Sequence, residues 1–317
     1  MEHVLRDLRF GLRLLLQSPA YSFTAIAVLA LGIGMNTAMF SAVKAVLLSQ
    51  LPYPDPDRLV QLWQTNKRGT QMTVSGPDFR DWRGQNRSMQ HLASFDNSTV
   101  ILAGSFTPQR IRIAVVSNGF FEALGTPAFV GHALTAEEQK AGGVPAVVLG
   151  YELSKTIFGE SGSGIGQGVR IDGMAFTVVG IMPPGFDFPD RSQAWIPQEF
   201  FGDETARSAH NYHVLGRTKT GVSIAQAQAD MNVIAERLAK AYIDDRDQGI
   251  RVKPLYEEIV GSTRPAFMAL STAVGLVLLI ACVNISNLQL ARATLRMREL
   301  ALRTAIGAGR ARLFGNY

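Results

Sequence analysis

The 317-residue sequence is poor in the groups that build most enzyme sites. It has one cysteine, Cys282, so no disulfide can form within the chain, and cysteine usage does not indicate the redox compartment. It has no glycine-rich loop ending in Lys followed by Ser or Thr, and no nucleophile elbow or Ser/His/Asp order. Charge is also absent from two long stretches, residues 14–43 and 265–291. These absences argue against a disulfide-stapled domain, a P-loop nucleotide site and a hydrolase triad.

The two stretches without charge are long and apolar. The second can cross a hydrocarbon core of about 30 Å as one helix, which predicts a transmembrane helix over 265–291. The first follows Ser18-Pro19, a typical helix cap and first-turn proline, and predicts a transmembrane helix over 20–47. A secretory signal peptide is the alternative here. We favour the span, because a signal peptide has an apolar region of only about 7–15 residues and a small-x-small cleavage site, which is not evident here.

Small residues recur at helical spacing along the first predicted span. Ala30, Gly34 and Ala38 lie on one face, a pattern that lets a second helix approach closely. A span that is merely rich in Ala and Gly, with no specific partner, would show the same row. Before this span, residues 1–19 alternate leucines with Arg6, Arg9 and Arg13 at a helical period, as in a helix lying at the membrane interface.

Basic residues are concentrated at the two ends of the chain. Residues 1–43 and 265–317 hold nine Lys and Arg against three Asp and Glu, whereas residues 44–264 hold 22 against 23. Because positive flanks stay in the cytoplasm, both termini are expected to be cytoplasmic and the middle extracytoplasmic. The basic charge therefore indicates membrane topology and not nucleic-acid binding. The predicted division is interfacial helix 1–19, span 20–47, extracytoplasmic domain 48–264, span 265–291 and cytoplasmic segment 292–317.

The sequence between the spans mixes strands and helices without a regular βα repeat. Alternating or continuous apolar runs predict strands, and capping residues predict helices after Ser75 and Ser223. This pattern indicates an α+β domain of two lobes. The predicted strands are 58–65, 92–95, 99–102, 110–116, 144–150, 169–171, 175–182, 195–197, 212–217 and 250–255.

Candidate chemical sites in this domain are weak. His210 and His213 are closely spaced, but no third zinc ligand lies near them in the sequence, and surface histidines are the commoner interpretation. The Gly/Ser loop 159–168 lacks the Lys-Ser/Thr pair of a phosphate loop and leads into a strand. We therefore predict no catalytic, cofactor or metal residues and no enzyme activity.

Several dispersed stretches resemble the permeases of MacB/FtsX-type ABC transporters. SPAYSFTAIAVLALGIGMNTAMFSAVKAVLL with LPYPDPDRLV is similar to their opening. Three stretches resemble the extracytoplasmic core domain of these permeases: VSNGFFEALGTPAFVGHALT, VRIDGMAFTVVGIMPPGFDFP and GRTKTGVSIAQAQADM. A further stretch, ACVNISNLQLARATLRMRELALRTAIGAGRARL, resembles the start of their permease domain. The resemblance covers almost the whole chain and implies a two-lobed domain of the family's Porter and Sabre type.

The resemblance also implies a role for the segment after the second span. There it places a coupling helix that docks on a separate ABC ATPase, with Arg298, Glu299, Leu300, Leu302, Arg303, Ile306 and Gly307 as the coupling residues. ATP would be bound by that partner and not by this chain. The implied function is coupling of ATP hydrolysis to movement of the extracytoplasmic domain, in export or mechanotransmission, at the bacterial inner membrane. Other implied partners are a second copy or further permease segments and membrane lipid.

Two other interpretations share this outline. Permeases of the family have at least four spans, so we interpret the sequence as a truncated or short form of one.

The first alternative is a two-span bacterial sensor with an extracytoplasmic ligand-binding domain, which has the same order of span, domain and span. A sensor would continue in heptads toward a signalling domain, whereas Gly307-Ala308-Gly309 interrupts any heptad. A membrane-anchored enzyme would need a converging polar site, which we do not find in the sequence.

Overall fold

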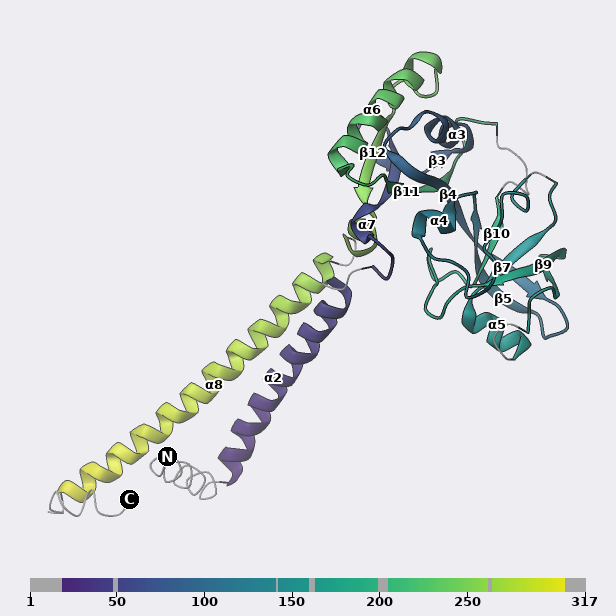
Figure 1. The fold of residues 1–317 in the computed structure, drawn as a ribbon. Coiled ribbons are helices and arrows are strands. Elements are labelled where there is room, and N and C mark those ends of the chain that lie inside the picture. The colour runs from purple at the N-terminus through teal and green to yellow at the C-terminus, as the bar shows by residue number, and fades with distance from the viewer. Residues whose placement is uncertain are drawn as a thin grey trace. The chain divides into compact units, whose positions relative to one another are not determined.

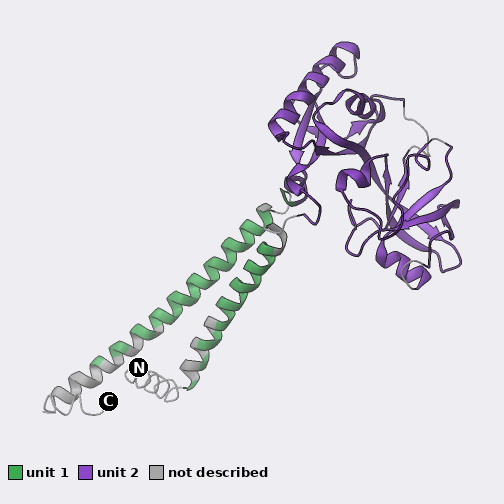
Figure 2. Ribbon diagram, in the orientation of Figure 1, with its two compact units in different colours: residues 1–49, 260–317 green, residues 50–259 purple. Residues whose placement is uncertain are grey.

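The computed structural model describes residues 19–47, 51–140, 142–159, 163–198, 205–261 and 264–305. The chain divides into two compact units (Figure 2). One comprises residues 1–49 and 260–317 and contains two long helices, which we call the helix pair. The other comprises residues 50–259 and is called the sheet domain.

One mixed sheet runs through the sheet domain (Figure 1). Its main path has the order β12-β1-β11-β4-β5-β10-β7-β9-β6. The strands on this path are β1 (Leu59–Thr65), β4 (Met89–Ala103), β5 (Gln109–Val116), β6 (Val130–Gly131), β7 (Ala146–Leu149), β9 (Met174–Ile181), β10 (Ala194–Pro197), β11 (His210–Thr218) and β12 (Gly249–Pro254). Off the path, β2 (Gln71–Met72) pairs with β1, β3 (Val74–Ser75) with β11, and β8 (Gly168–Ile171) with β4 and β9.

Short helices complete the sheet domain. They are the 3-10 helix η1 (Pro56–Arg58) and the α-helices α3 (Gly76–Gln85), α4 (Phe120–Leu124), α5 (Tyr151–Phe158), α6 (Ile224–Ala241) and α7 (Leu255–Gly261). Side-chain caps fix the starts of two of them. The Ser75 hydroxyl accepts from the Asp78 amide at the start of α3, and Ser223 and Gln226 form a reciprocal capping box on α6.

Strand β4 joins two lobes. Its first half pairs with β11, as in the register Ala93↔Leu215, and its second half pairs with β5, as in Val100↔Ile111. Around the first half, α3 and α6 cover a core that includes Trp82. Around the second half, α5 and strands β5, β7, β8 and β9 enclose another core, and a third, aromatic core lies between them. Figure 1 shows α6 beside β12 in one lobe and α5 beside β5 and β7 in the other.

The predicted α+β class is confirmed, with one correction within the sheet. Residues 92–95 and 99–102 were expected to be two strands, but both belong to β4. Asp96, Asn97 and Ser98 lie between them and suggest a turn, yet each pairs in register with β5. The three side chains lie on the strand surface, so their polarity does not interrupt the ladder. Strands β2, β3 and β6 have two residues each and left no periodic signal.

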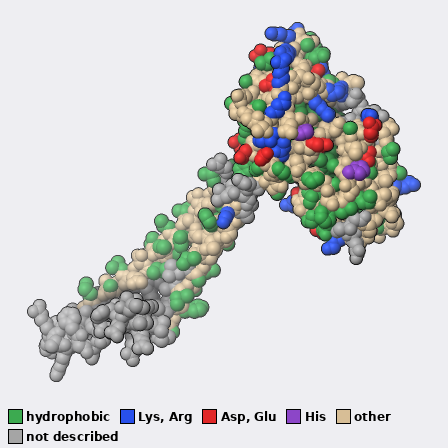
Figure 3. All heavy atoms as spheres, in the orientation of Figure 1, with side chains coloured by type: hydrophobic (Ala, Val, Ile, Leu, Met, Phe, Trp, Pro, Cys, Tyr) green, Lys and Arg blue, Asp and Glu red, His purple; other side chains and the backbone are tan. Residues whose placement is uncertain are grey.

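The helix pair consists of α2 (Pro19–Leu47) and α8 (Arg264–Ala305), which contact each other along their lengths. In the described residues, the stretch Pro265–Asn287 of α8 is long and apolar enough to cross a membrane, and no other helix meets that criterion. Figure 3 shows hydrophobic side chains along the described face of this pair. The predicted span 20–47 coincides with α2 and stays a prediction, as does the interfacial helix 1–19, nearly all of which lies outside the described residues.

Candidate functional site

The two helices of the pair meet along seams with alternating spacings of four and three residues. Gly32, Asn36 and Met39 are among the less exposed positions on α2, and α8 turns Val274, Leu278, Ala281 and Ile285 inward. This spacing is that of a coiled-coil seam. The two helices are close at Gly32, where an added Cβ would lie 3.0 Å from Leu278 Cδ1 and 3.9 Å from Ala281 Cβ. Glycine therefore allows close packing of α2 on α8.

The predicted small-residue row lies on a different face of α2. Ala30, Gly34 and Ala38 are all exposed, and an added Cβ on Gly34 would meet nothing within 4 Å among the described residues. The row does not pack on α8 within this chain. Its proposed role, close approach of another helix, stays a prediction.

The predicted coupling residues lie at the far end of α8. Arg298, Glu299, Leu300, Leu302 and Arg303 continue the same helix that begins at Arg264, without a break at Arg292. Nothing is described of these five side chains, and Ile306 and Gly307 lie outside the described residues. The coupling role is untested by this geometry.

A buried arginine holds the segment through which the chain enters the sheet domain. Arg217 on β11 is 5% exposed. Its guanidinium donates to the carbonyls of Pro54 (2.8 Å) and Asp55 (3.4 Å), and also to Ala123 (2.6 Å) and Leu124 (3.2 Å) at the end of α4. Burial lowers the pKa of Arg217 and nearby Arg58 lowers it further, while Asp55 raises it. Because an arginine guanidinium is not deprotonated in proteins, the group stays charged. One side chain thus joins segment 54–55, strand β11 and helix α4.

The same segment is held by aromatic packing. The ring of Tyr53 lies edge-on to Phe186 and to Phe188, each with ring centroids 6.4 Å apart. Phe186 in turn contacts Trp195, and Phe188 stacks on Phe120 in the central core. Burial, assisted by the charge of Asp187, raises the pKa of Tyr53. The phenol is therefore neutral and acts as a packing group.

The segment by which the chain leaves the sheet domain is also held. Leu255, the first residue of α7, is fully buried in the central core. Glu258, on the next turn, accepts a 3.2 Å hydrogen bond from the Trp63 indole and lies 3.8 Å from the Lys253 ammonium. Residues near both chain junctions are therefore tied to β1, β11 and β12.

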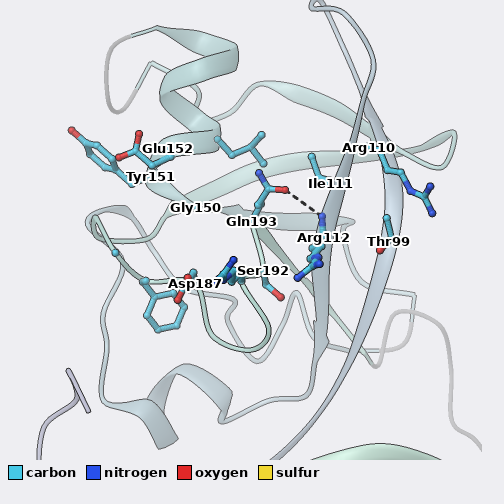
Figure 4. A pocket seen from close by; sticks show the side chains of 14 residues that line it. Thr99, Arg110, Ile111, Arg112, Gly150, Tyr151, Glu152, Asp187, Ser192 and Gln193 are labelled. Atoms are coloured by element: carbon cyan, nitrogen blue, oxygen red, sulfur yellow. Dashed lines mark hydrogen bonds between the residues drawn. The ribbon is translucent and has the colours of Figure 1, made fainter. Parts of the chain in front are cut away.

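An open cavity of about 760 Å³ lies in the lobe that contains α5 (Figure 4). Its wall includes Arg110 and Arg112 from β5 and the start of α5 at Tyr151. The backbone amide of Arg112 donates to Gln193 Oε1 at 3.3 Å. The Arg112 guanidinium lies 3.5 Å from the Asp190 carboxylate. Three arginines, including Arg191, against two lining carboxylates make the wall slightly cationic. This volume suits a small ligand.

The two histidines singled out in the sequence lie in different surroundings. His213 stacks on Phe95, with centroids 5.2 Å apart, and lies edge-on to Trp63. Burial lowers the pKa of His213, partly offset by Asp96 and Glu258. His210 lies at the start of β11 and pairs with Ser75 in the ladder. In the described ranges no group of three His, Cys, Asp or Glu side chains is placed to hold a metal ion.

Sequence patterns did not reveal the most connected polar groups. Arg217 begins, with Gly216, one of the stretches that carry the family resemblance, but that resemblance gave it no role. A charged residue within a run of buried strand positions was the local signal that could have marked it. Asp245 and Arg207 lie in irregular segments, where carboxylates and guanidiniums normally face solvent. Their burial arises from tertiary packing.

Comparison with known proteins gives consistent matches. The model of the MacB-like periplasmic core domain matches residues 22–234. A curated protein named probable export ATP-binding/permease protein MacB, from Pseudomonas entomophila (strain L48), is 19% identical over 232 residues, which are 70% of this chain and 34% of that protein. The chain thus spans about a third of the length of that relative.

Solved structures of similar domains also match. The extracellular domain of the noncanonic ABC-type transporter YknZ from Gram-positive bacteria is 13% identical, with a TM-score of 0.47, over 61% of this chain and 99% of that one. The periplasmic region of MacB from Actinobacillus actinomycetemcomitans is 14% identical, with a TM-score of 0.49, over 65% of this chain and 92% of that one.

Proposed function

This chain belongs to the family of the MacB-like periplasmic core domain, and we propose that it acts as a membrane permease component of an ABC transporter, driven by a separate ATPase. Its sheet domain would lie outside the cytoplasm, between α2 and α8 as membrane spans. The proposal rests most directly on the family match together with the apolar stretch Pro265–Asn287. The uneven placement of basic residues supports cytoplasmic termini.

Helix α8 is suited to carrying movement across a membrane. Its 42 residues correspond to about 63 Å at 1.5 Å per residue, roughly twice the hydrocarbon thickness. Beyond Asn287 it continues for 18 residues, or about 27 Å. A tilt imposed on this end would therefore reach the other end without passing through a flexible joint.

Both chain junctions are built to pass such a movement into the sheet domain. Segment 54–55 is bonded to Arg217, and α7 is bonded to Trp63 through Glu258. These contacts reach β11 and β1, which are neighbours in the sheet. We infer that displacement of the helices changes the arrangement of the lobes, which is mechanotransmission without a substrate tunnel within the chain.

The proposal assigns the chemistry to the partner. ATP is bound and hydrolysed by an ABC ATPase subunit, so this chain is not an enzyme and needs no cofactor of its own. A second copy or further permease segments complete the membrane assembly, with lipid around the spans and no nucleic acid. The localisation we propose is the bacterial inner membrane, with residues 48–264 extracytoplasmic.

The ATPase docking site is proposed to be the end of α8. Leu300, Leu302 and Ile306 provide an apolar stripe, and Glu299 is an acidic residue among arginines. An acidic residue is unfavourable against anionic lipid but can pair with a basic cleft on a protein. This contrast distinguishes docking from simple membrane anchoring.

Charge reversal at Glu299 tests the proposal. An ABC ATPase should co-purify with the chain from its source cells, and Glu299→Lys should reduce that yield at least tenfold while membrane insertion is unchanged. Glu152→Lys, an exposed reversal in the sheet domain, is the matched control and should leave the yield unaltered. If no ATPase accompanies the wild-type chain, or if Glu299→Lys and Leu302→Asp both retain it, the docking assignment is wrong.

A further inference from the structure

Three buried oxygen atoms converge on one small cavity in the lobe that contains α3 and α6. Gln64 Oε1, Asp245 Oδ1 and Gln248 Oε1 are inaccessible to solvent and accept no hydrogen bond from the described part of the chain. All three residues line a cavity of about 10 Å³ whose remaining wall is Trp82, Ala235, Leu238, Gly249 and Ile250. A buried acceptor without a donor costs about 1–3 kcal/mol, so three together demand an explanation.

Neither glutamine can solve this by turning its amide over. The Gln64 amide nitrogen already donates to Asp78 Oδ2 at 3.0 Å. The Gln248 amide nitrogen already donates to the Asp244 carbonyl at 2.6 Å. Reversing either amide would set an oxygen against an oxygen, so both cavity-facing atoms are fixed as acceptors.

We propose that this cavity is a binding site for one water molecule and one proton, with the proton on Asp245 Oδ1. The cavity has the volume of about one water probe and offers three polar partners, which are the two requirements for a buried water. A water donates two hydrogen bonds and therefore satisfies two of the three oxygens. The protonated Asp245 hydroxyl donates to the water, which donates to Gln64 Oε1 and Gln248 Oε1, so every atom has its partner.

The surrounding charges favour a proton at Asp245. Arg207 contacts three carboxylates, those of Asp78, Asp81 and Asp245, and its guanidinium lies 3.4 Å from the Tyr242 ring centroid. One positive charge faces three potential negative charges, and exposed Asp244 lies beside them. Asp78 is the better partner for Arg207 because it also accepts from Gln64 Nε2 and from the Ser75 hydroxyl at 2.6 Å. Asp245 has the one carboxylate oxygen of this group that is buried and without a donor.

The electrostatic balance agrees with this placement. Burial, and then the charge of Asp78, raise the pKa of Asp245 to about 6, although Arg207 opposes the shift; hydrogen bonding to the Asp78 carboxyl and the charge of Asp244 raise the pKa further. Between pH of about 4, the ordinary carboxyl value, and about 6, the folded chain holds a proton that the unfolded chain has lost. Stability should therefore fall as pH rises through this window and level off above it. The site makes this lobe sensitive to the mildly acidic range.

Replacing the carboxyl by an amide tests the site in the full-length chain. Asp245→Asn keeps a donor at the cavity without a titrating group, so the fall in unfolding temperature that accompanies rising pH between 4.5 and 7.5 should disappear. Asp245 should contribute about 4–8 °C to that fall in the wild type, as expected for a pKa of about 6. Tryptophan fluorescence, to which Trp82 in the cavity wall contributes, reports unfolding. Asp244→Asn, the exposed neighbour, should keep the wild-type slope.

A second variant separates the water from the proton. Gln248→Met removes one of the three acceptors, so a water alone satisfies the remaining two and the midpoint of the pH dependence should move downward. The proposal is overturned if Asp245→Asn keeps the wild-type slope. It is also overturned if Asp245→Asn fails to fold or is less stable at every pH than the wild type at pH 7.5, since the ionised carboxylate would then be the native form.

Discussion

At the scale of single residues, Arg217 stands out because its guanidinium joins separate backbone segments of the sheet domain. In the described part of the chain, the hydrogen-bond partners of its guanidinium are all carbonyl oxygens. It also lies under Gly125, where an added Cβ would be 3.4 Å from the guanidinium and from Pro54 Cγ. The left-handed backbone of Gly125, with φ of +68°, ends α4 at this point.

Removing this arginine should be costly. Arg217→Met would leave the buried carbonyls of Ala123 and Leu124 without donors, for an expected loss of about 2–5 kcal/mol in the free energy of unfolding. Arg170→Met, an exposed arginine on β8, should change it by less than about 0.5 kcal/mol. Urea denaturation of the purified chain measures both, and equal losses would show that Arg217 is not an anchor.

His213 gives a pH dependence of the opposite sign to Asp245. Its lowered pKa means that the folded chain binds this proton less readily than the unfolded chain. Stability should therefore fall as pH drops below about 6.5, the ordinary histidine value. In an Asp245→Asn background, His213→Phe should abolish the remaining loss between pH 7 and 5, measured by thermal unfolding. His91→Gln in the same sheet is the control, and an unchanged slope in His213→Phe would contradict the assignment.

At the scale of elements, local patterns predicted most strands and helices because apolar alternation and caps are local properties. The cap at Ser75 and the capping box at Ser223 are confirmed, as are the strand positions other than the division of β4. What sequence could not supply is pairing. Strand β10 runs parallel to β5 but antiparallel to β7, and nothing in Ala194–Pro197 indicates either neighbour. Long-range pairing is set by the whole sheet.

The seam of the helix pair was not identified from the sequence. The sequence singled out the row through Gly34 without naming its partner helix, whereas Gly32 is the glycine that faces α8. The reason is that two glycines two residues apart point to different sides of a helix, and pattern alone does not choose between them. The role of the Gly34 row toward another helix remains a prediction.

A disulfide test distinguishes the two glycines. The Cβ positions of residues 32 and 281 lie 3.9 Å apart, which is within the range of disulfides, about 3.5–4.5 Å. With Cys282 replaced by Ser, the pair Gly32→Cys and Ala281→Cys should oxidise readily in the membrane. The pair Gly34→Cys and Ala281→Cys should not. Mobility on a non-reducing gel after cleavage within the sheet domain reads the result, and equal cross-linking of both pairs would contradict the seam.

At the scale of the whole molecule, the order of span, domain and span was predicted from the distribution of charge. The family resemblance, now supported by the match over residues 22–234, supplied the fold type. Buried sites such as the Gln64, Asp245 and Gln248 cavity were beyond sequence reasoning, because two of its three residues lie in a turn that looks solvated. Function at the α8 end rests on the side chains of Arg298 to Arg303, whose roles are proposed from sequence.

Membrane topology tests the central claim most directly. With Cys282 replaced by Ser, a cysteine at exposed Ser98 of the sheet domain and, separately, one at exposed Met297 of α8 are treated with a membrane-impermeant maleimide in intact spheroplasts. The permease arrangement predicts labelling of Ser98→Cys and protection of Met297→Cys until the membrane is opened. Protection of Ser98→Cys with labelling of Met297→Cys would place the sheet domain in the cytoplasm and contradict the proposed function.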